Sequence, residues 1–384
     1  MSARNAPHSV DRKFLLICVA LLCSGLFILA SASMPLAQQE YGNALYYVVR
    51  QITIGGAAGL LALLLVQIIP LSLIRGAALP SLIITIAFLI GVFLPGIGLE
   101  SGGATRWIHA GPVAIQPAEI AKITLPLYLA AWFSSRGLET RWQHSRSEKK
   151  RAAPPNQEQR LFPFLVIIGA LGIPIILQPD LSTFGILAAT GLLVYFLAGA
   201  PFRVLSWLLA SGAVSFVLLV RLAPYRMNRI LSFLNPQADP LGAGYQINQA
   251  LLAIGSGGVF GRGLGFSREK LFFLPEPIGD SIFAIFAEET GFLGSALLIS
   301  LFVLFLWRGF AIARRLPDAF MQLFTAGLVA GVAIQAFLNI AGNLALFPIV
   351  GITLPFVSYG SASLAVTMLS AGLVLKMSRY TRVP

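Results

Sequence analysis

The chain has 384 residues, of which 57% are hydrophobic and 11% are charged, and its mean hydropathy is +0.82. This composition excludes a soluble protein and predicts an all-α polytopic membrane protein. The formal net charge of +12 is typical here of cytoplasmic loops and anionic-lipid contacts, so we expect no nucleic-acid partner.

Apolar runs close to the length that crosses a bilayer, roughly 20 residues, recur along the whole chain. The third run is the shortest and the weakest candidate. We therefore expect one domain over residues 1–384 with about ten transmembrane helices, at Phe14–Met34, Ile52–Ile69, Leu79–Leu94, Pro117–Phe133, Leu161–Leu177, Leu181–Leu197, Val204–Val220, Ser281–Trp307, Ala319–Ile340 and Leu354–Met377.

The first run resembles a secretory signal, because basic residues precede it and an Ala-Ser-Ala sequence follows its middle. It is longer than the apolar region of a usual signal peptide, which favours an uncleaved first helix. Cys18 and Cys23 lie in this run. Their spacing places them on different helix faces, so we expect no disulfide between them.

Basic residues predict the orientation, because cytoplasmic loops retain Lys and Arg. With the N-terminus inside, the inner segments hold 18 of the 27 basic residues and the outer segments hold eight, while Lys122 lies within a helix. Six of those eight lie in the long loop 221–280, where the rule is weak. Both termini are therefore expected in the cytoplasm, and the loop between the seventh and eighth helices outside it.

Two long connections interrupt the helices. Residues 134–160 form a charged linker with two adjacent prolines, which we interpret as flexible, cytoplasmic and non-catalytic. The loop 221–280 is too long to lack structure of its own, so we expect short interfacial helices in it. Its glycine cluster, Gly255–Gly265, does not predict a nucleotide site, because no strand precedes it.

Unusual polar residues occur where the even-numbered helices begin, all on the predicted outer face. Helix capping explains each of them singly. Together, four helix N-termini that face one pocket would suit an anionic headgroup such as a lipid pyrophosphate. The residues are Gln116 and Glu119 at the fourth helix, Gln178 and Asp180 at the sixth, Glu276 and Asp280 at the eighth, and Ser358 at the tenth, with Arg106 in the loop before the fourth.

Lys122 is exceptional, because the helix macrodipole opposes a cation in the first turns of a helix. It needs an anionic neighbour, which could be Glu119 or Asp180. Ionisable groups inside a membrane are functional by default. Glu288 and Glu289, deeper in the eighth helix, either define a polar passage or are packed by hydrogen bonds. No histidine cluster predicts a metal site, and no Ser/His/Asp arrangement predicts a nucleophile.

Several motifs together resemble the SEDS family (shape, elongation, division and sporulation) from the first helix to the last. Pro224–Arg226 and Gly263–Gly265 are more similar to its division branch, FtsW, than to its elongation branch, RodA. Ser182, Ser281 and Gly360–Ala362 depart from the family pattern, which affects local backbone geometry rather than any charged group. The motifs are Gly102–Trp107, Gln116–Lys122, Gln178–Leu181, Asp239–Gln246, Leu274–Glu276 and Leu354–Gly360.

The resemblance implies a peptidoglycan glycosyltransferase, serving division or shape, that polymerises lipid II on the outer face of the cytoplasmic (inner) membrane. The implied partners are lipid II, undecaprenyl-pyrophosphate-linked glycan, a class B penicillin-binding protein transpeptidase, and other divisome or elongasome membrane proteins. The residue that matches Asp280 is the family's essential catalytic carboxylate. Residues at functionally important positions are Arg106, Glu119, Lys122, Asp180 and Glu276, and we add Gln178, Lys270 and Ser358 as further substrate-binding candidates.

A sugar hydroxyl that attacks an anomeric carbon needs a general base, for which Asp280 is the candidate. A helix N-terminus would keep that carboxylate ionised. Arg106, Lys122 and the outer-loop arginines could neutralise the leaving pyrophosphate, with or without a divalent cation such as Mg or Mn. Glu276 could orient the acceptor or balance Lys270.

Two other functions remain open at this stage. A lipid II flippase would use the same headgroup pocket but needs polar access from the inner face, which Lys122 and the Glu288–Glu289 pair could provide. A purely structural scaffold leaves an ionisable cluster on one side of the membrane unexplained.

Overall fold

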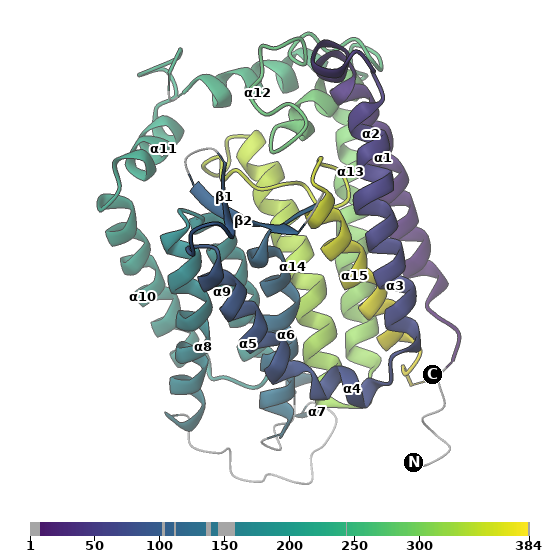
Figure 1. Ribbon diagram of the computed structural model, residues 1–384, viewed down its shortest axis with the longest axis vertical. Helices are drawn as coiled ribbons and strands as arrows, with labels where there is room; N and C mark the ends of the chain where they lie inside the picture. The colour runs from purple at the N-terminus through teal and green to yellow at the C-terminus, as the bar shows by residue number, and fades with distance from the viewer. Residues whose placement is uncertain are drawn as a thin grey trace.

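The computed structural model describes residues 8–101, 104–110, 113–135, 140–144, 158–242 and 244–382. These residues form a helical bundle, and most of its long helices run along the longest axis of the molecule (Figure 1). All ten predicted runs contain a helix. The helices are α1 (Arg12–Tyr41), α3 (Ala57–Ile68), α5 (Ala78–Gly91), α6 (Pro117–Ser135), α8 (Glu158–Leu177), α9 (Leu181–Leu197), α10 (Phe202–Arg221), α13 (Ile282–Arg315), α14 (Ala319–Asn343) and α15 (Ser361–Ser378).

Six helical segments in the described part of the chain are long and apolar enough to cross a membrane. The protein is therefore a multi-pass membrane protein, and the exact number of crossings stays a prediction. The second of these segments joins α2 (Tyr46–Arg50), a π-helical stretch (Gln51–Gly56) and α3. A short helix, α4 (Leu71–Gly76), leads into α5. The six segments are Arg12–Tyr41, Tyr46–Ile68, Phe202–Arg221, Ile282–Arg315, Ala319–Asn343 and Ser361–Ser378.

The prediction of an all-α fold is wrong in one place. Between α5 and α6, the strands β1 (Gly98–Ser101), β2 (Ala104–Ala110) and β3 (Val113–Ile115) form an antiparallel sheet in the order β1-β2-β3. Residues 104–108 include Thr, Trp and Ile, which favour a pleated and half-buried surface. The segment is too short and too polar to predict a transmembrane helix, and hydrophobic runs alone do not reveal its preference for strands.

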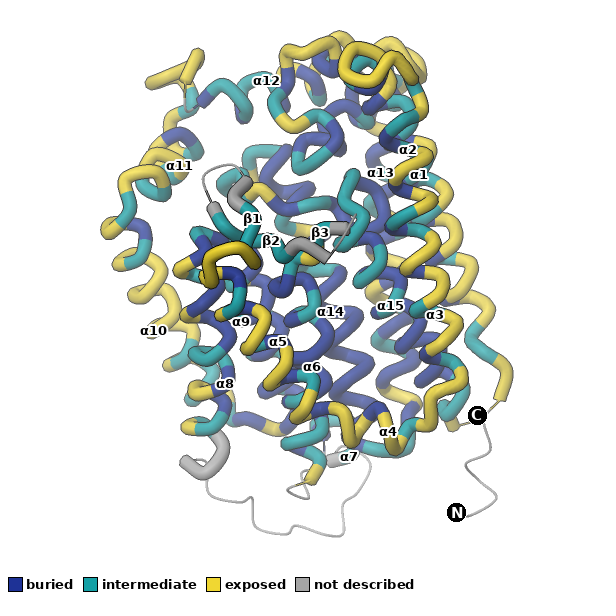
Figure 2. Tube along the Cα trace, in the orientation of Figure 1, coloured by how far each residue is buried: buried dark blue, intermediate teal, exposed yellow. Residues whose placement is uncertain are grey.

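The helix α14 lies at the centre of the bundle, where α6, α9, α13 and α15 pack against it. It is buried on nearly all sides, as the dark tube in Figure 2 shows. The helix α10 lies at the periphery, where it packs on α9 and α11, and Val220 is its buried residue. Buried polar side chains on α14 therefore have protein neighbours in every direction, whereas α10 presents apolar side chains outward.

The two long connections differ in how much of them the structure describes. The predicted short helices of the 221–280 loop are present as α11 (Pro224–Leu234) and α12 (Tyr245–Gly257). Most of the 134–160 linker lies outside the described residues, apart from its start and α7 (Arg141–His144).

The helix α13 is broken at Gly291, whose φ of 67° and ψ of −161° are not helical. The half before Gly291, which follows Asp280, leaves carbonyl groups without helical partners. Main-chain N–H groups of Arg262 and Gly263 donate to the carbonyls of Glu288 and Glu289, both at 3.0 Å. The loop that precedes Asp280 is therefore fastened along the half-helix that follows it.

The glycine cluster permits this close approach of two backbones. A Cβ atom on Gly257 would lie 2.2 Å from the carbonyl oxygen of Ala287, and one on Gly261 would lie 2.2 Å from that of Glu289. Gly261 also has a φ of +81°, which residues with a side chain rarely adopt. The cluster thus serves packing.

The two ends of the described chain meet at one end of the bundle. The N–H of His8 donates to the carbonyl of Arg379 at 2.7 Å, and Asp11 forms an ion pair with Arg308 at 2.5 Å. This agrees with an even number of crossings. Cys18 is buried, Cys23 is exposed and both are free, as their spacing predicted.

We expect Gly261→Ala to destabilise the protein by about 2 kcal/mol or more, because it adds backbone strain to a steric clash with the Glu289 carbonyl. Thermal unfolding of the purified protein in detergent measures the change. Gly255→Ala is the matched control, since a Cβ atom there meets no atom within 4 Å. Equal stability of the two variants would contradict this account of the loop.

Candidate functional site

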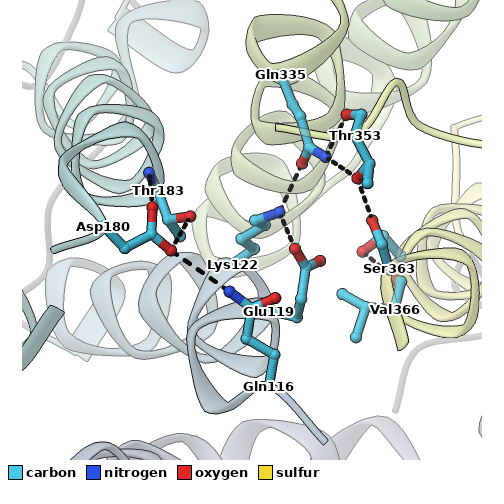
Figure 3. A network of polar contacts seen from close by, with 10 residues as sticks. Gln116, Glu119, Lys122, Asp180, Thr183, Gln335, Thr353, Ser363 and Val366 are labelled. Carbon is cyan, nitrogen blue, oxygen red and sulfur yellow. Dashed lines mark hydrogen bonds and ion pairs between the residues drawn. The ribbon is translucent and has the colours of Figure 1, made fainter. Parts of the chain in front are cut away.

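Lys122 takes Glu119 as its anionic neighbour. Its Nζ lies 2.6 Å from Glu119 Oε1 and donates to Gln335 Oε1 on α14 at 2.7 Å. Both side chains of the ion pair are about one-tenth exposed. Gln335 continues the network by donating to the carbonyl oxygen of Thr353 at 2.9 Å, and Thr353 bonds with Ser363 at the start of α15 (Figure 3). The network therefore joins α6, α14 and α15.

Asp180 is a helix cap, as the simplest interpretation of its position predicted. Its carboxylate accepts from the N–H and the hydroxyl of Thr183, at 3.0 and 2.8 Å, in the first turn of α9. Gln116 Nε2 also donates to it at 3.4 Å, which links α9 to the start of α6 (Figure 3). The nearby Gln178 is 1% exposed and donates to the carbonyl of Leu89 at 2.8 Å.

Arg106 lies on β2 and holds the turn before α9. Its guanidinium donates to the carbonyl oxygens of Gln178 and Pro179, both at 2.8 Å. Pro179 has a φ of 29°, an unusual conformation that these two bonds help to fix. The cation thus lies beside the residues that cap α9, and its position depends on the sheet that the sequence prediction missed.

Asp280 is not a helix cap, which corrects the prediction. The helix α13 begins at Ile282 after Ser281, and no side-chain cap bond forms there. The Asp280 carboxylate instead accepts from Gln246 Nε2 of α12 at 3.2 Å and from the Ser281 hydroxyl at 3.4 Å. The carboxylate is therefore held by the side chains of Gln246, in the 221–280 loop, and of Ser281, and not by helix N–H groups.

Burial and, as a smaller cause, the charge of the neighbouring Glu276 carboxylate together raise the pKa of Asp280 to about 6. The hydrogen bond from Gln246 and the charge of Arg229 on α11 oppose this shift. The pKa of this carboxylate is thus raised rather than lowered at the start of the helix, because desolvation has the largest effect. A carboxylate with a pKa near 6 is still mostly ionised at neutral pH and can accept a proton.

Glu276 and Ser358 lie on either side of the Asp280 turn. Glu276 is exposed, has a φ of 49°, and accepts main-chain bonds from Gly279 and Ser281. The Ser358 hydroxyl donates to the carbonyl of Gly279 at 2.6 Å. The last helix was predicted to start at Leu354, but α15 starts at Ser361, because residues 355–359 form turns that reach this site.

Lys270 lies away from Glu276 and is paired elsewhere. It is 5% exposed, and its Nζ lies 2.7 Å from Glu289 Oε1 and 3.2 Å from the carbonyl of Ser31 on α1. Glu288, in turn, pairs with Arg262 at 3.1 Å. The two glutamates are thus neutralised and packed by the 221–280 loop, so the packing interpretation describes them and Lys270 does not balance Glu276.

Sequence reasoning missed the amide side chains of α14. Gln335, Asn339 and Asn343 follow each other at intervals of four, which places them on one face of the helix. The Nδ2 atoms of Asn339 and Asn343 donate to the main-chain carbonyl of Asp280 at 2.9 and 2.8 Å. The sequence contains this spacing, and three amides on one face of an apolar helix indicate a functional or structural polar site.

A small pocket adjoins Asp280 between α14 and the segment that follows it. The pocket is lined by Asp280, Leu338, Asn339, Gly342, Asn343, Ile349, Val350, Gly351 and Ile352.

Among the described residues, no group of three or more His, Cys, Asp or Glu side chains could hold a metal ion.

These features define a multi-pass membrane protein with a buried polar site near one end of its bundle. The family model of cell cycle proteins of the FtsW, RodA and SpoVE type matches residues 12–383. The chain therefore belongs to the FtsW/RodA/SpoVE family, the family whose motifs it resembles.

Similar proteins cover nearly the whole chain. Stage V sporulation protein E of Bacillus subtilis is 37% identical over 97% of this chain and 98% of its own. A probable peptidoglycan glycosyltransferase FtsW of Thioalkalivibrio is 39% identical over 98% of this chain and 91% of its own. A chain from a solved peptidoglycan synthase complex, described as coordinating polymerisation and crosslinking, has a TM-score of 0.77 and 27% identity over 96% of this chain and 98% of its own.

We expect Lys122→Met to cost about 3 kcal/mol of stability, because it leaves the Glu119 carboxylate buried without a cation. The double variant Lys122→Met with Glu119→Gln removes that charge as well and should recover part of the loss. Unfolding in detergent measures both. A double variant that is no more stable than Lys122→Met would show that the unpaired Glu119 charge is not what destabilises the single variant.

Proposed function

We propose that the protein is a peptidoglycan glycosyltransferase that polymerises lipid II with Asp280 as the general base. The carboxylate supports this role because it lies beside a pocket, is held in place by Gln246 and the α14 amides, and has a pKa near 6. The names of its relatives and its similarity to a chain of a peptidoglycan synthase complex support the same activity.

In this reaction, the 4-hydroxyl oxygen of the acceptor's terminal N-acetylglucosamine forms a bond to the anomeric carbon of the donor. The bond from that carbon to the pyrophosphate oxygen breaks, and the pyrophosphate leaves with the electron pair. The hydroxyl proton passes to Asp280, which raises the nucleophilicity of the oxygen. Attack from the face opposite the leaving group inverts the anomeric configuration.

The departing pyrophosphate needs positive charge nearby. Arg229 on α11 is exposed and lowers the pKa of Asp280 through its charge, so it lies within electrostatic reach of the reaction. Arg106 adds a second cation at the neighbouring helix start. Lys122 is neutralised by Glu119, so its contribution is to hold α6 against α14. Glu276, Gln178, Asp180, Lys270 and Ser358 position these elements.

The site is proposed to face outward from the cytoplasmic (inner) membrane, with both termini cytoplasmic and residues 221–280 on the outer side. The excess of basic residues on the opposite segments supports this orientation. A class B penicillin-binding protein is the proposed partner, because the similar solved chain belongs to a complex that couples polymerisation with crosslinking.

Asp280→Asn should abolish glycan formation, because the amide cannot accept the proton of the attacking hydroxyl. Purified protein with its penicillin-binding partner and lipid II in detergent provides the assay, with polymer detected by gel electrophoresis. Asp318→Asn is the matched control: it makes the same charge change at the start of α14, the opposite end of the bundle from the Asp280 turn, and should leave polymerisation intact.

Full polymerisation by Asp280→Asn would refute the base assignment. Translocation of the lipid II headgroup across liposomes without any polymer would favour the flippase instead.

Polymerisation should fall as the pH drops through about 6, because protonated Asp280 cannot act as a base. Since the Glu276 charge raises the pKa of Asp280, Glu276→Gln should move this acid limb to lower pH, whatever its effect on the maximum rate. Initial rates between pH 5 and 8, roughly one to two units on either side of the limb, measure the shift. An acid limb that stays in place or moves to higher pH in Glu276→Gln would contradict the assignment.

A further inference from the structure

Three consecutive carbonyl groups at the turn before α13 each accept a hydrogen bond from another part of the chain. That of Asp280 accepts from the α14 amides. That of Gly279 accepts from the Ser358 hydroxyl at 2.6 Å. That of Ile278 accepts from the Tyr359 N–H at 2.8 Å. The segment that leads into α15 therefore holds the backbone of this turn together with α14.

The side chain of Gln51 holds that segment in turn. It is 1% exposed, its Nε2 donates to the carbonyl of Ser358 at 3.2 Å, and its Oε1 accepts from the N–H of Gly360 at 3.1 Å. Both polar atoms of the amide are thus paired with the backbone on either side of Tyr359. One helical turn earlier, the ring of Tyr47 packs edge-on against the Tyr359 ring, with centroids 4.9 Å apart.

A local change in helix geometry accompanies this contact. Gln51 begins the π-helical stretch Gln51–Gly56, which joins α2 to α3. A π-helical turn contains an extra residue, which rotates the residues before it by about 100° relative to those after it, and such turns are frequent at functional sites. The stretch and α3 both pack on α15 (Figure 1), and a Cβ atom on Gly55 would lie 2.8 Å from Ser361 Cα. The close packing of these helices keeps Gln51 against the segment 358–360.

We propose that Gln51 is a positioning residue for the reaction: through Ser358 it holds the turn from which the Asp280 carboxylate reaches the acceptor hydroxyl. This inference rests on the proposed function. Gln51 acts through the backbone and not on the substrate, because both of its polar atoms are used within the fold and it does not line the pocket beside Asp280. A general base must be held closely, since a misplacement of about 1 Å can lower the rate about a hundredfold.

Gln51→Met tests this role, because methionine keeps the approximate volume of the side chain but forms neither hydrogen bond. The variant should lower kcat for polymerisation of lipid II roughly ten- to hundredfold and leave KM within about twofold, because the substrate contacts remain while the base is misplaced. The assay uses purified full-length protein with its penicillin-binding partner, and rates are referred to the folded fraction. A purely structural role would lower that fraction and leave kcat unchanged.

Gln67 provides a matched control on the same pair of helices. Its Nε2 donates to the carbonyl of Gly372 on α15 at 2.8 Å, so it also joins α3 to the backbone of α15. Gly372 lies eleven residues after Ser361, which is roughly 16 Å further along the helix and away from the Asp280 turn. Gln67→Met should therefore lower the unfolding temperature but leave kcat unchanged.

The path through Ser358 can be tested separately. Ser358→Ala removes the hydroxyl that donates to the Gly279 carbonyl. If Gln51 acts through this hydroxyl, Gln51→Met should lower kcat by a smaller factor in the Ser358→Ala protein than in the wild-type protein. Equal factors in the two backgrounds would show that Gln51 does not act through Ser358, and they overturn the inference.

A wild-type kcat in Gln51→Met overturns the inference as well, and so does an equal loss of kcat in Gln67→Met, which would show that any loosened contact on α15 slows the reaction. If the methionine variant does not fold, Gln51→Asn and Gln67→Asn give the same comparison with a shortened amide. These failures are distinct from failure of the proposed function. If Asp280→Asn is inactive while Gln51→Met keeps the wild-type kcat, the inference about Gln51 alone is wrong.

Discussion

The structure depends most on the hydrogen bonds that α14 gives to the turn at Asp280. In an apolar bundle, a main-chain carbonyl that accepts no bond is costly, because no water replaces the missing donor. Asn339 and Asn343 both donate to the carbonyl of Asp280, so the most buried helix holds the backbone from which the carboxylate projects. The base candidate is therefore positioned through its backbone by the core, while its side chain remains available.

The surroundings of Asp280 set its protonation through opposed effects. Burial and the Glu276 carboxylate raise the pKa, whereas Gln246 and Arg229 lower it. The result, near 6, lies close to the value at which a carboxylate is both ionised at neutral pH and basic enough to take a proton from a sugar hydroxyl. Gln246 and Arg229 belong to α12 and α11, so the 221–280 loop sets the pKa of a group that the core positions.

The 221–280 loop is itself held by charge pairs that pack against the broken helix α13. Lys270 and Arg262 neutralise Glu289 and Glu288, and the loop's glycines let its backbone approach the half-helix. The Lys270–Glu289 pair is buried on both sides, and such a pair is costly to form and more costly to break. The charge pairs and the close backbone contacts therefore fix the position of the loop relative to the half-helix that follows Asp280. A flexible connection would leave that position free to vary.

The sequence by itself determined the membrane class, the ten helical runs and the family, and it indicated Asp280 as the candidate base, because hydrophobic runs and contiguous motifs are local properties of the chain. It also contained the spacing of the α14 amides, although only their contacts revealed what they hold. Tertiary structure decided which neighbour each polar group has: Glu119 for Lys122, Glu289 for Lys270, and Gln246 rather than a helix N-terminus for Asp280. These pairings join residues that are distant in sequence, and the pKa of Asp280 depends on burial, which exists only after the helices have packed together.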